Sequence, residues 1–173
     1  MLAYLFLLLA VATRFPEHPW SFTPIGAALL FFGARMPLRR LWIAVALLAG
    51  VDVYLTTTRY AYPLTWDHVV TWAWYAAVVA LGSGVLKRNA RPLRLAGAAL
   101  ATSISFFLVS NFAVWAVWNM YPKTAGGLMM SYAAALPFFR NTVASDLFFT
   151  ALMFGIAALL APVAGESEEK LAV

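Results

Sequence analysis

The chain has 173 residues, of which 64% are hydrophobic and 11% are charged. A soluble domain carries about 25% charged residues, so this composition excludes a water-exposed globular surface and indicates one membrane-embedded domain. The net charge of +5 does not indicate nucleic-acid binding, because the basic residues cluster in short segments between apolar runs. The absence of cysteine excludes disulfide and thiol chemistry.

Six long apolar stretches predict membrane-spanning helices at residues 2–13, 24–36, 41–57, 69–86, 93–118 and 141–163. The second is short and bracketed by Pro24 and Pro37, so we expect it to be tilted or partly inserted. Residues 124–139 are glycine-rich and predict one short interfacial or partly inserted helix. The fold class is therefore an all-α polytopic membrane bundle of about six transmembrane helices plus one short helix. A single transmembrane domain at 1–163 precedes a short acidic cytoplasmic tail at 164–173.

The positions of the basic residues predict the orientation of the bundle. Residues 35–40 contain three arginines, and residues 87–94 contain four basic residues. Positive charge concentrates on the cytoplasmic side of membrane proteins. We therefore expect these two loops and both termini to be cytoplasmic, in a bacterial inner membrane. The connections at 14–23, 58–68 and 119–140 are then expected to face outward.

Aromatic residues gather on the predicted outward side. Six of the seven tryptophans lie on or near it: Trp20, Trp66, Trp72, Trp74, Trp115 and Trp118. An interfacial aromatic belt would explain them, but a belt normally appears at both interfaces. Aromatic walls of a ligand pocket are the other interpretation. Both remain open from the sequence.

Three polar residues lie within the predicted outer halves of three spans: Asp52, Asn111 and Asp146. Their depths below the helix ends are roughly 7–12 Å at the rise of an α-helix, so they could line one outward cavity. Arg14 and Arg140 would be their counter-charges. Ionisable residues at membrane depth mark functional sites by default, but a structural ion pair between helices explains the aspartates equally well.

The two histidines, His18 and His68, stand beside acidic residues in the outer loops. The chain has no zinc-binding or catalytic motif, so we assign no catalytic or metal-binding residue. The candidate ligand-binding residues are Arg14, His18, Trp20, Asp52, His68, Asn111, Trp115, Tyr132, Arg140 and Asp146. The segment "RFPEHPWSFTP" contains three prolines, which stiffen a loop, and it predicts a lid over the outward cavity.

Four segments carry a resemblance: "RFPEHPWSFTPIGAALLFFGAR", "SNFAVW", "MYPKTAGGLMMSYAAALPFFRNT" and "SDLFF". They resemble the signature segments of a family of uncharacterised bacterial integral membrane proteins. More distantly, the layout is similar to the S components of energy-coupling factor (ECF) vitamin transporters. That resemblance implies capture of a vitamin outside the cell and transport on a membrane partner driven by ATPase subunits. The first helix lacks the strict small-residue spacing through which S components dock their partner, which favours a solitary protein.

The sequence therefore predicts a membrane protein that binds a small vitamin-like solute from the outer side for uptake. No cofactor is expected, although a cobalamin-like or other vitamin ligand fits the resemblance. The expected partners are the lipid bilayer, the solute, and the transmembrane and ATPase subunits of an ECF transporter, with no nucleic acid. Two alternatives remain: an accessory subunit of a larger membrane complex, and a small intramembrane enzyme acting on lipid.

Overall fold

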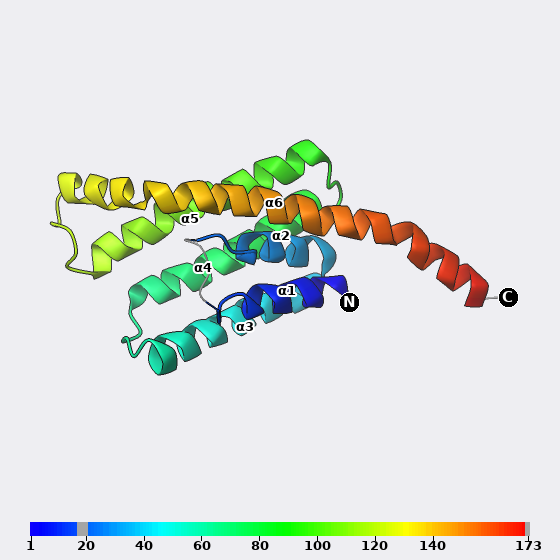
Figure 1. The fold of residues 1–173 in the computed structure, drawn as a ribbon, viewed down its shortest axis with the longest axis horizontal. Helices are drawn as coiled ribbons and strands as arrows, with labels where there is room; N and C mark the ends of the chain where they lie inside the picture. The colour runs from blue at the N-terminus through cyan, green and yellow to red at the C-terminus, as the bar shows by residue number, and fades with distance from the viewer. Residues whose placement is uncertain (17–20, 172–173) are drawn as a thin grey trace.

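The computed structural model describes residues 1–16 and 21–171, with side chains up to residue 161. Within these residues all regular structure is helical, as expected. The elements are α1 (Leu2–Ala12), α2 (Ile25–Arg35), the 3-10 turn η1 (Leu38–Arg40), α3 (Leu41–Tyr54), the π-helical turn η2 (Leu55–Arg59), α4 (Trp66–Leu81), the π-helical turn η3 (Gly82–Leu86), α5 (Pro92–Val117) and α6 (Ala125–Leu171). They form an elongated bundle along whose whole length α6 runs (Figure 1).

Four of the described helical segments are long and apolar enough to cross a bilayer: Leu38–Arg59, Trp66–Leu86, Pro92–Val117 and Ala125–Ala161. α1 and α2 have only 11 residues each. At the rise of an α-helix this is about 17 Å, roughly half of a hydrocarbon core. The expectation of six spanning helices is therefore corrected to four helices that are long and apolar enough to span a membrane and two short ones.

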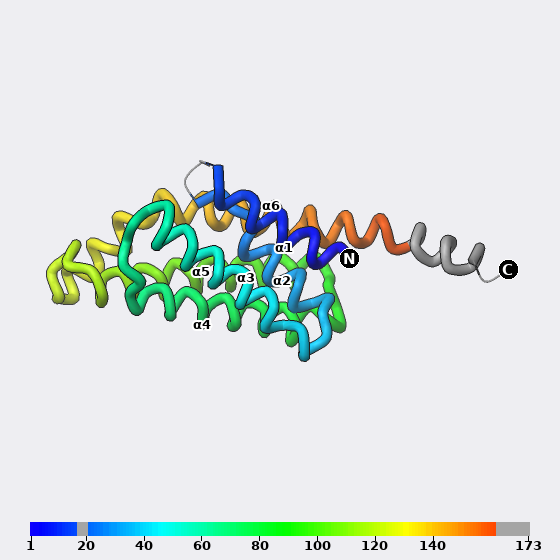
Figure 2. Tube along the Cα trace, turned by 90° about the horizontal axis from the view of Figure 1, so that it is seen from below, coloured from blue at the N-terminus to red at the C-terminus, as the bar shows by residue number. Residues whose placement is uncertain are grey.

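α1 and α2 form a hairpin, and the end of α1 and the start of α2 lie midway along the long helices (Figure 2). At one side of the tip, Arg14 binds Tyr75, the tenth residue of the 21-residue segment Trp66–Leu86. At the other side, the Thr23 carbonyl accepts a hydrogen bond from Ser145, near the middle of Ala125–Ala161. The connection at 14–23, which was expected to lie outside the bundle, therefore starts and ends inside it.

α2 is the central helix of the molecule. Every residue from Gly26 to Ala34 is buried, and α2 packs against all five other α-helices. A helix that is apolar on all faces is expected to be buried on all faces. Glycine allows the closest of these contacts: a Cβ on Gly33 would meet the Val79 carbonyl, and one on Gly82 would meet the Leu30 carbonyl.

The segment 124–139 is not a separate short helix. It forms the first turns of α6, which continues without interruption through Pro137. Two hydroxyl groups attach this part of α6 to α5: Ser131 donates to the Asn111 carbonyl at 3.2 Å and Tyr132 donates to the Leu108 carbonyl at 3.0 Å. Proline is tolerated inside membrane helices when neighbouring helices support the chain. The structure therefore has six α-helices among its described residues, and not seven.

The two basic loops lie at the same end of the bundle. One connects α2 to α3 and the other connects η3 to α5, and the N-terminus lies at this end as well (Figure 1). The half-length hairpin enters and leaves the bundle from this end, so it does not alter the relative orientation of the two loops. The positive-inside preference still places them on one side.

We predict that this basic end is cytoplasmic. The chain has no natural cysteine, so a single cysteine introduced in place of Arg39 or Arg91 reports only its own position. Both should resist a membrane-impermeant thiol reagent in intact cells, whereas a cysteine at Lys123 should react. Labelling at position 39 from outside the cell would reverse the orientation and place the tip of the hairpin toward the cytoplasm.

Candidate functional site

The shortness of the α1–α2 hairpin leaves a space beyond its tip, which we call the tip cavity. It has a volume of about 270 Å³ and is enclosed by the loop that follows α1, the start of α2, η2, α4, α5 and α6. Its polar lining includes Arg14, Thr142 and Asp146. Four aromatic residues complete the walls: Tyr60, Trp74, Tyr75 and Phe106.

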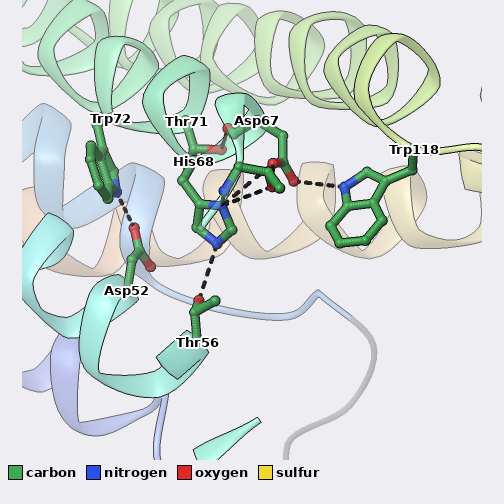
Figure 3. Close-up of polar contacts among 8 residues, drawn as sticks. Asp52, Thr56, Asp67, His68, Thr71, Trp72 and Trp118 are labelled. Atoms are coloured by element: carbon green, nitrogen blue, oxygen red, sulfur yellow. Dashed lines mark hydrogen bonds and ion pairs between the residues drawn. The ribbon is translucent and has the colours of Figure 1, made fainter. Parts of the chain in front are cut away.

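Arg14 is held in place by two long helices. Its Nη1 forms an ion pair of 2.5 Å with Oδ1 of Asp52 on α3 and donates a hydrogen bond of 3.2 Å to the Tyr75 hydroxyl on α4. The second oxygen of Asp52 accepts a hydrogen bond from the indole nitrogen of Trp72 at 3.0 Å (Figure 3). Asp52 is 6% exposed and does not line the tip cavity. Asp52 lies behind Arg14 and holds in place the Arg14 side chain, which lines the cavity.

The Arg14 guanidinium stays charged in this setting. An arginine guanidinium is not deprotonated in proteins, and here it binds both Asp52 and Tyr75. A permanent cation beside a buried carboxylate satisfies both charges. The pair therefore attaches the end of α1 to α3.

Asp146 on α6 lies on another side of the tip cavity and is 3% exposed. Its Oδ2 accepts a hydrogen bond of 2.6 Å from the Ser103 hydroxyl on α5. Its Oδ1 lies against Gly26, where any side chain on α2 would collide with it. Among the described residues Asp146 forms no ion pair. The two aspartates that looked alike in the sequence thus differ, because only Asp52 has a cation beside it.

The aromatic walls are ordered by contacts among themselves. Trp74 packs on Phe106 with ring centroids 4.7 Å apart, and its indole nitrogen donates to the Ser105 hydroxyl at 3.0 Å. Trp74 also packs beside Tyr75. These rings come from α4 and α5, whose packing sets the width of the cavity.

Asn111 lines a smaller pocket of about 170 Å³ between α5 and α6. This pocket shares Ser21, Phe106 and Thr142 with the tip cavity. The side-chain nitrogen of Asn111 donates to the Phe107 carbonyl at 2.8 Å. Asn111 therefore lies in a side pocket next to the tip cavity.

Three other candidates lie away from the tip cavity. The Trp115 indole donates to the Pro122 carbonyl at 2.8 Å and orders the connection between α5 and α6. Tyr132 packs on Phe107, its hydroxyl bound to α5. Arg140 is exposed on α6. Two further candidates, His18 and Trp20, lie outside the described residues.

His68 belongs to a polar network at the far end of α4 (Figure 3). Its Nδ1 accepts a hydrogen bond from the Thr65 amide at 3.3 Å and its Nε2 lies 3.1 Å from the Thr56 hydroxyl. Asp67 accepts hydrogen bonds from the Thr65 hydroxyl and, at 3.2 Å, from the Trp118 indole. This network caps α4 and connects it to η2 and to the end of α5. Among the described residues no group of three or more metal-ligating side chains is present.

Sequence reasoning missed three residues that shape the tip cavity or hold its polar groups: Gly26, Tyr75 and Ser103. Trp74 was among the tryptophans for which the wall of a ligand pocket was one of two interpretations. A signal for Tyr75 was available, since it lies in the middle of an apolar helix, where a phenol needs a partner. No sequence signal distinguished Gly26 or Ser103 from the other glycines and serines of the chain.

One protein family matches almost the whole chain. The family DUF6580, described as a family of unknown function, matches residues 1–168. No curated protein and no solved structure matches the chain. The match includes α1 to α5 and nearly all of α6, so both the hairpin and the residues around the tip cavity lie within it. The chain belongs to the family DUF6580.

Proposed function

We propose that the protein binds a small solute in the tip cavity, entering from the side of the membrane opposite the basic loops, as the first step of uptake. The observation that carries the proposal is that a guanidinium, a carboxyl group and four aromatic rings line one space between the helices. Ligand sites are mostly apolar cavities with a few convergent polar groups, and the tip cavity has this composition.

The size of the cavity limits the solute. Its volume of about 270 Å³ lies just below the range of about 300–1,000 Å³ that is typical for drug-sized ligands. One or two aromatic rings fit such a space between Trp74, Tyr75 and Phe106. The proposed ligand is therefore a compact ring-bearing solute, in preference to a macrocycle such as cobalamin.

The charges limit its chemistry. Arg14 makes its contacts with Asp52 and Tyr75 through Nη1, and a guanidinium has five donors. Its other donors suit a carbonyl or carboxylate oxygen of the solute. A ring with such an acceptor would stack on the aromatic wall while its oxygen binds Arg14.

Delivery of the solute to ATPase-driven partner subunits, as in ECF S components, is part of this proposal. The basic end of the bundle, where α6 extends past the N-terminus (Figure 2), would then face such partners. A solitary carrier is the alternative within the same proposal. In both cases the tip cavity is the site at which the solute is captured.

We expect that filling the cavity abolishes binding. Thr142→Trp places an indole in the tip cavity from α6, whereas Leu152→Trp places the same side chain on the exposed face of the same helix. Mass spectrometry of small molecules released from the purified proteins should find a compound retained by the wild type and by L152W but lost from T142W. The same compound should raise the melting temperatures of the wild type and of L152W but not that of T142W. Equal retention by T142W would place the binding site elsewhere.

A further inference from the structure

Between α5 and α6 lies a line of buried polar side chains that solute binding leaves largely unused. It consists of Thr102 and Ser103 on α5, and Asp146 and Thr150 on α6, and none of the four is more than 3% exposed. We call it the polar seam. Asp146 lines the tip cavity. Thr150 lines a second cavity of about 460 Å³ at the Arg35 end of α2, which we call the base cavity.

The seam connects the two cavities. The Ser103 hydroxyl lies 2.6 Å from Oδ2 of Asp146 and 3.2 Å from the Ala99 carbonyl. Asp146 belongs to the lining of the tip cavity and Ala99 to the lining of the base cavity. One hydroxyl group therefore stands between two cavities that open on opposite halves of α2.

The seam contains a carboxyl group that has no cation beside it among the described residues. The groups that face Asp146 are Gly26 on α2 and Ser103 on α5, and both are uncharged. Across the tip cavity lie Arg14 and Tyr75, and the charge of Arg14 is already neutralised by Asp52. An uncompensated carboxylate at membrane depth costs several kcal/mol. The Asp146 carboxylate therefore lacks a monovalent cation as its counter-charge.

The seam also has unused oxygen ligands. Thr57, Thr71 and Thr142 donate their hydroxyls to the carbonyl four residues earlier, which is the usual arrangement in a helix. Thr102 and Thr150 are buried and have no hydrogen-bond partner among the described residues. The methyl carbon of Thr102 and Oδ1 of Asp146 both lie beside Gly26. A turn about the Cα–Cβ bond of Thr102 would bring its hydroxyl to the carboxylate, and Thr150 follows Asp146 by one helical turn.

We propose that the polar seam is a sodium-binding site, with Asp146 as its charged ligand and the hydroxyls of Ser103, Thr102 and Thr150 as its neutral ligands. A proton would neutralise the carboxylate but would leave both threonine hydroxyls without a partner. A divalent cation would leave a net positive charge in the membrane interior, because the seam has one carboxylate. Hard cations prefer oxygen ligands, and sodium satisfies the charge and the hydroxyls together.

Such a site gives the protein a coupling ion. Sodium enters from the tip cavity beside the solute and leaves through the base cavity on the other half of the bundle. This goes beyond solute capture, since it supplies a driving force within the chain itself. Sodium binding does not require the solute, so the two proposals can fail separately.

The test uses a hydrophobic carbodiimide, which reacts with protonated carboxyl groups in apolar surroundings. Purified protein in choline chloride should be modified at Asp146, as located by peptide mass spectrometry, and replacement of choline by sodium should slow this reaction at least about tenfold. Asp52, paired with Arg14, is the internal control and should not react. The variant T102V/T150V keeps the shape of both side chains and removes both hydroxyls. It should need about tenfold more sodium for the same protection, as expected when supporting ligands of a metal site are lost.

T71V is the matched control and should be protected as well as the wild type, because Thr71 lies on α4 outside the seam. G26A, whose added methyl group displaces the Asp146 carboxylate, should also lose protection. If modification of Asp146 falls with rising pH but does not change with sodium, the seam binds a proton and the proposal is wrong. Equal protection of the wild type and T102V/T150V, or an Asp146 that never reacts, would overturn it as well. T102V/T150V should retain the solute, because neither threonine lines the tip cavity, so solute retention by this variant separates the two proposals.

Discussion

Replacement of Arg14 by methionine is expected to lower the stability of the folded protein by about 3 kcal/mol, because breaking a buried ion pair on one side leaves an uncompensated charge. Asp52 is 7% exposed in its side chain and would lose its only ion-pair partner among the described residues. The double variant R14M/D52N should recover most of the loss. Its asparagine is neutral and can still accept the hydrogen bond from Trp72, which is 3.0 Å long in the wild type.

Reversible unfolding in detergent, followed by intrinsic tryptophan fluorescence, measures both variants. Two roles for Arg14 are separated by also measuring solute retention. If R14M/D52N is stable but has lost the solute, Arg14 contacts the ligand. If it is stable and retains the solute, the pair serves only to hold the hairpin. An R14M variant as stable as the wild type would contradict the structural role of the pair.

The class of fold was predictable because it depends on composition and on the lengths of the apolar runs. Charged residues at 11% leave too little polar surface for a soluble domain. The grouping of the two basic loops also followed from the sequence, since it needs only the order of the elements. The pairing of Asp52 with Arg14 was one of two interpretations, and the structure shows that pair directly.

The half-length hairpin was not predicted, because hydropathy measures how apolar a segment is and not how far it reaches. The stretch at 2–13 is apolar enough for a span, but Arg14, which follows it, forms an ion pair with Asp52 inside the bundle. An arginine within a loop is normally taken as a sign of the interface. Here Asp52 and Tyr75 supply partners from two other helices, which no local pattern reveals.

The composition of the site was predicted only in part, because a local sequence pattern does not show which side chains from different helices meet. Asp52, Asn111 and Asp146 were predicted at similar depths, with Arg14 as a counter-charge, and of these four residues Arg14 and Asp146 line one cavity. Depth along a helix does not specify the direction in which a side chain points. Asn111 therefore lies in a neighbouring pocket and Trp115 at the end of α5, although both are on a helix that contributes to the tip cavity.

Replacement of Gly82 by alanine is expected to destabilise the protein by about 1–3 kcal/mol, the usual range for overpacking. A Cβ at this position would meet the Leu30 carbonyl of α2, and a backbone atom cannot move aside as the end of a side chain can. Gly84 lies two residues further along η3, and a Cβ there has nothing within 4 Å.

G84A is therefore the matched control, and it should be as stable as the wild type or slightly more stable, because alanine favours the helix. The comparison tests how α2 is kept in the bundle. Helices in a membrane associate through close packing at small residues, and α2 is too short to be held by spanning the bilayer. Gly33 makes the reciprocal contact with the Val79 carbonyl, so G33A should have an effect similar to that of G82A. Thermal unfolding in detergent measures all three variants. If G82A and G84A unfold at the same temperature, the close α2–α4 contact is not what holds the hairpin, and the Arg14–Asp52 pair must carry that role.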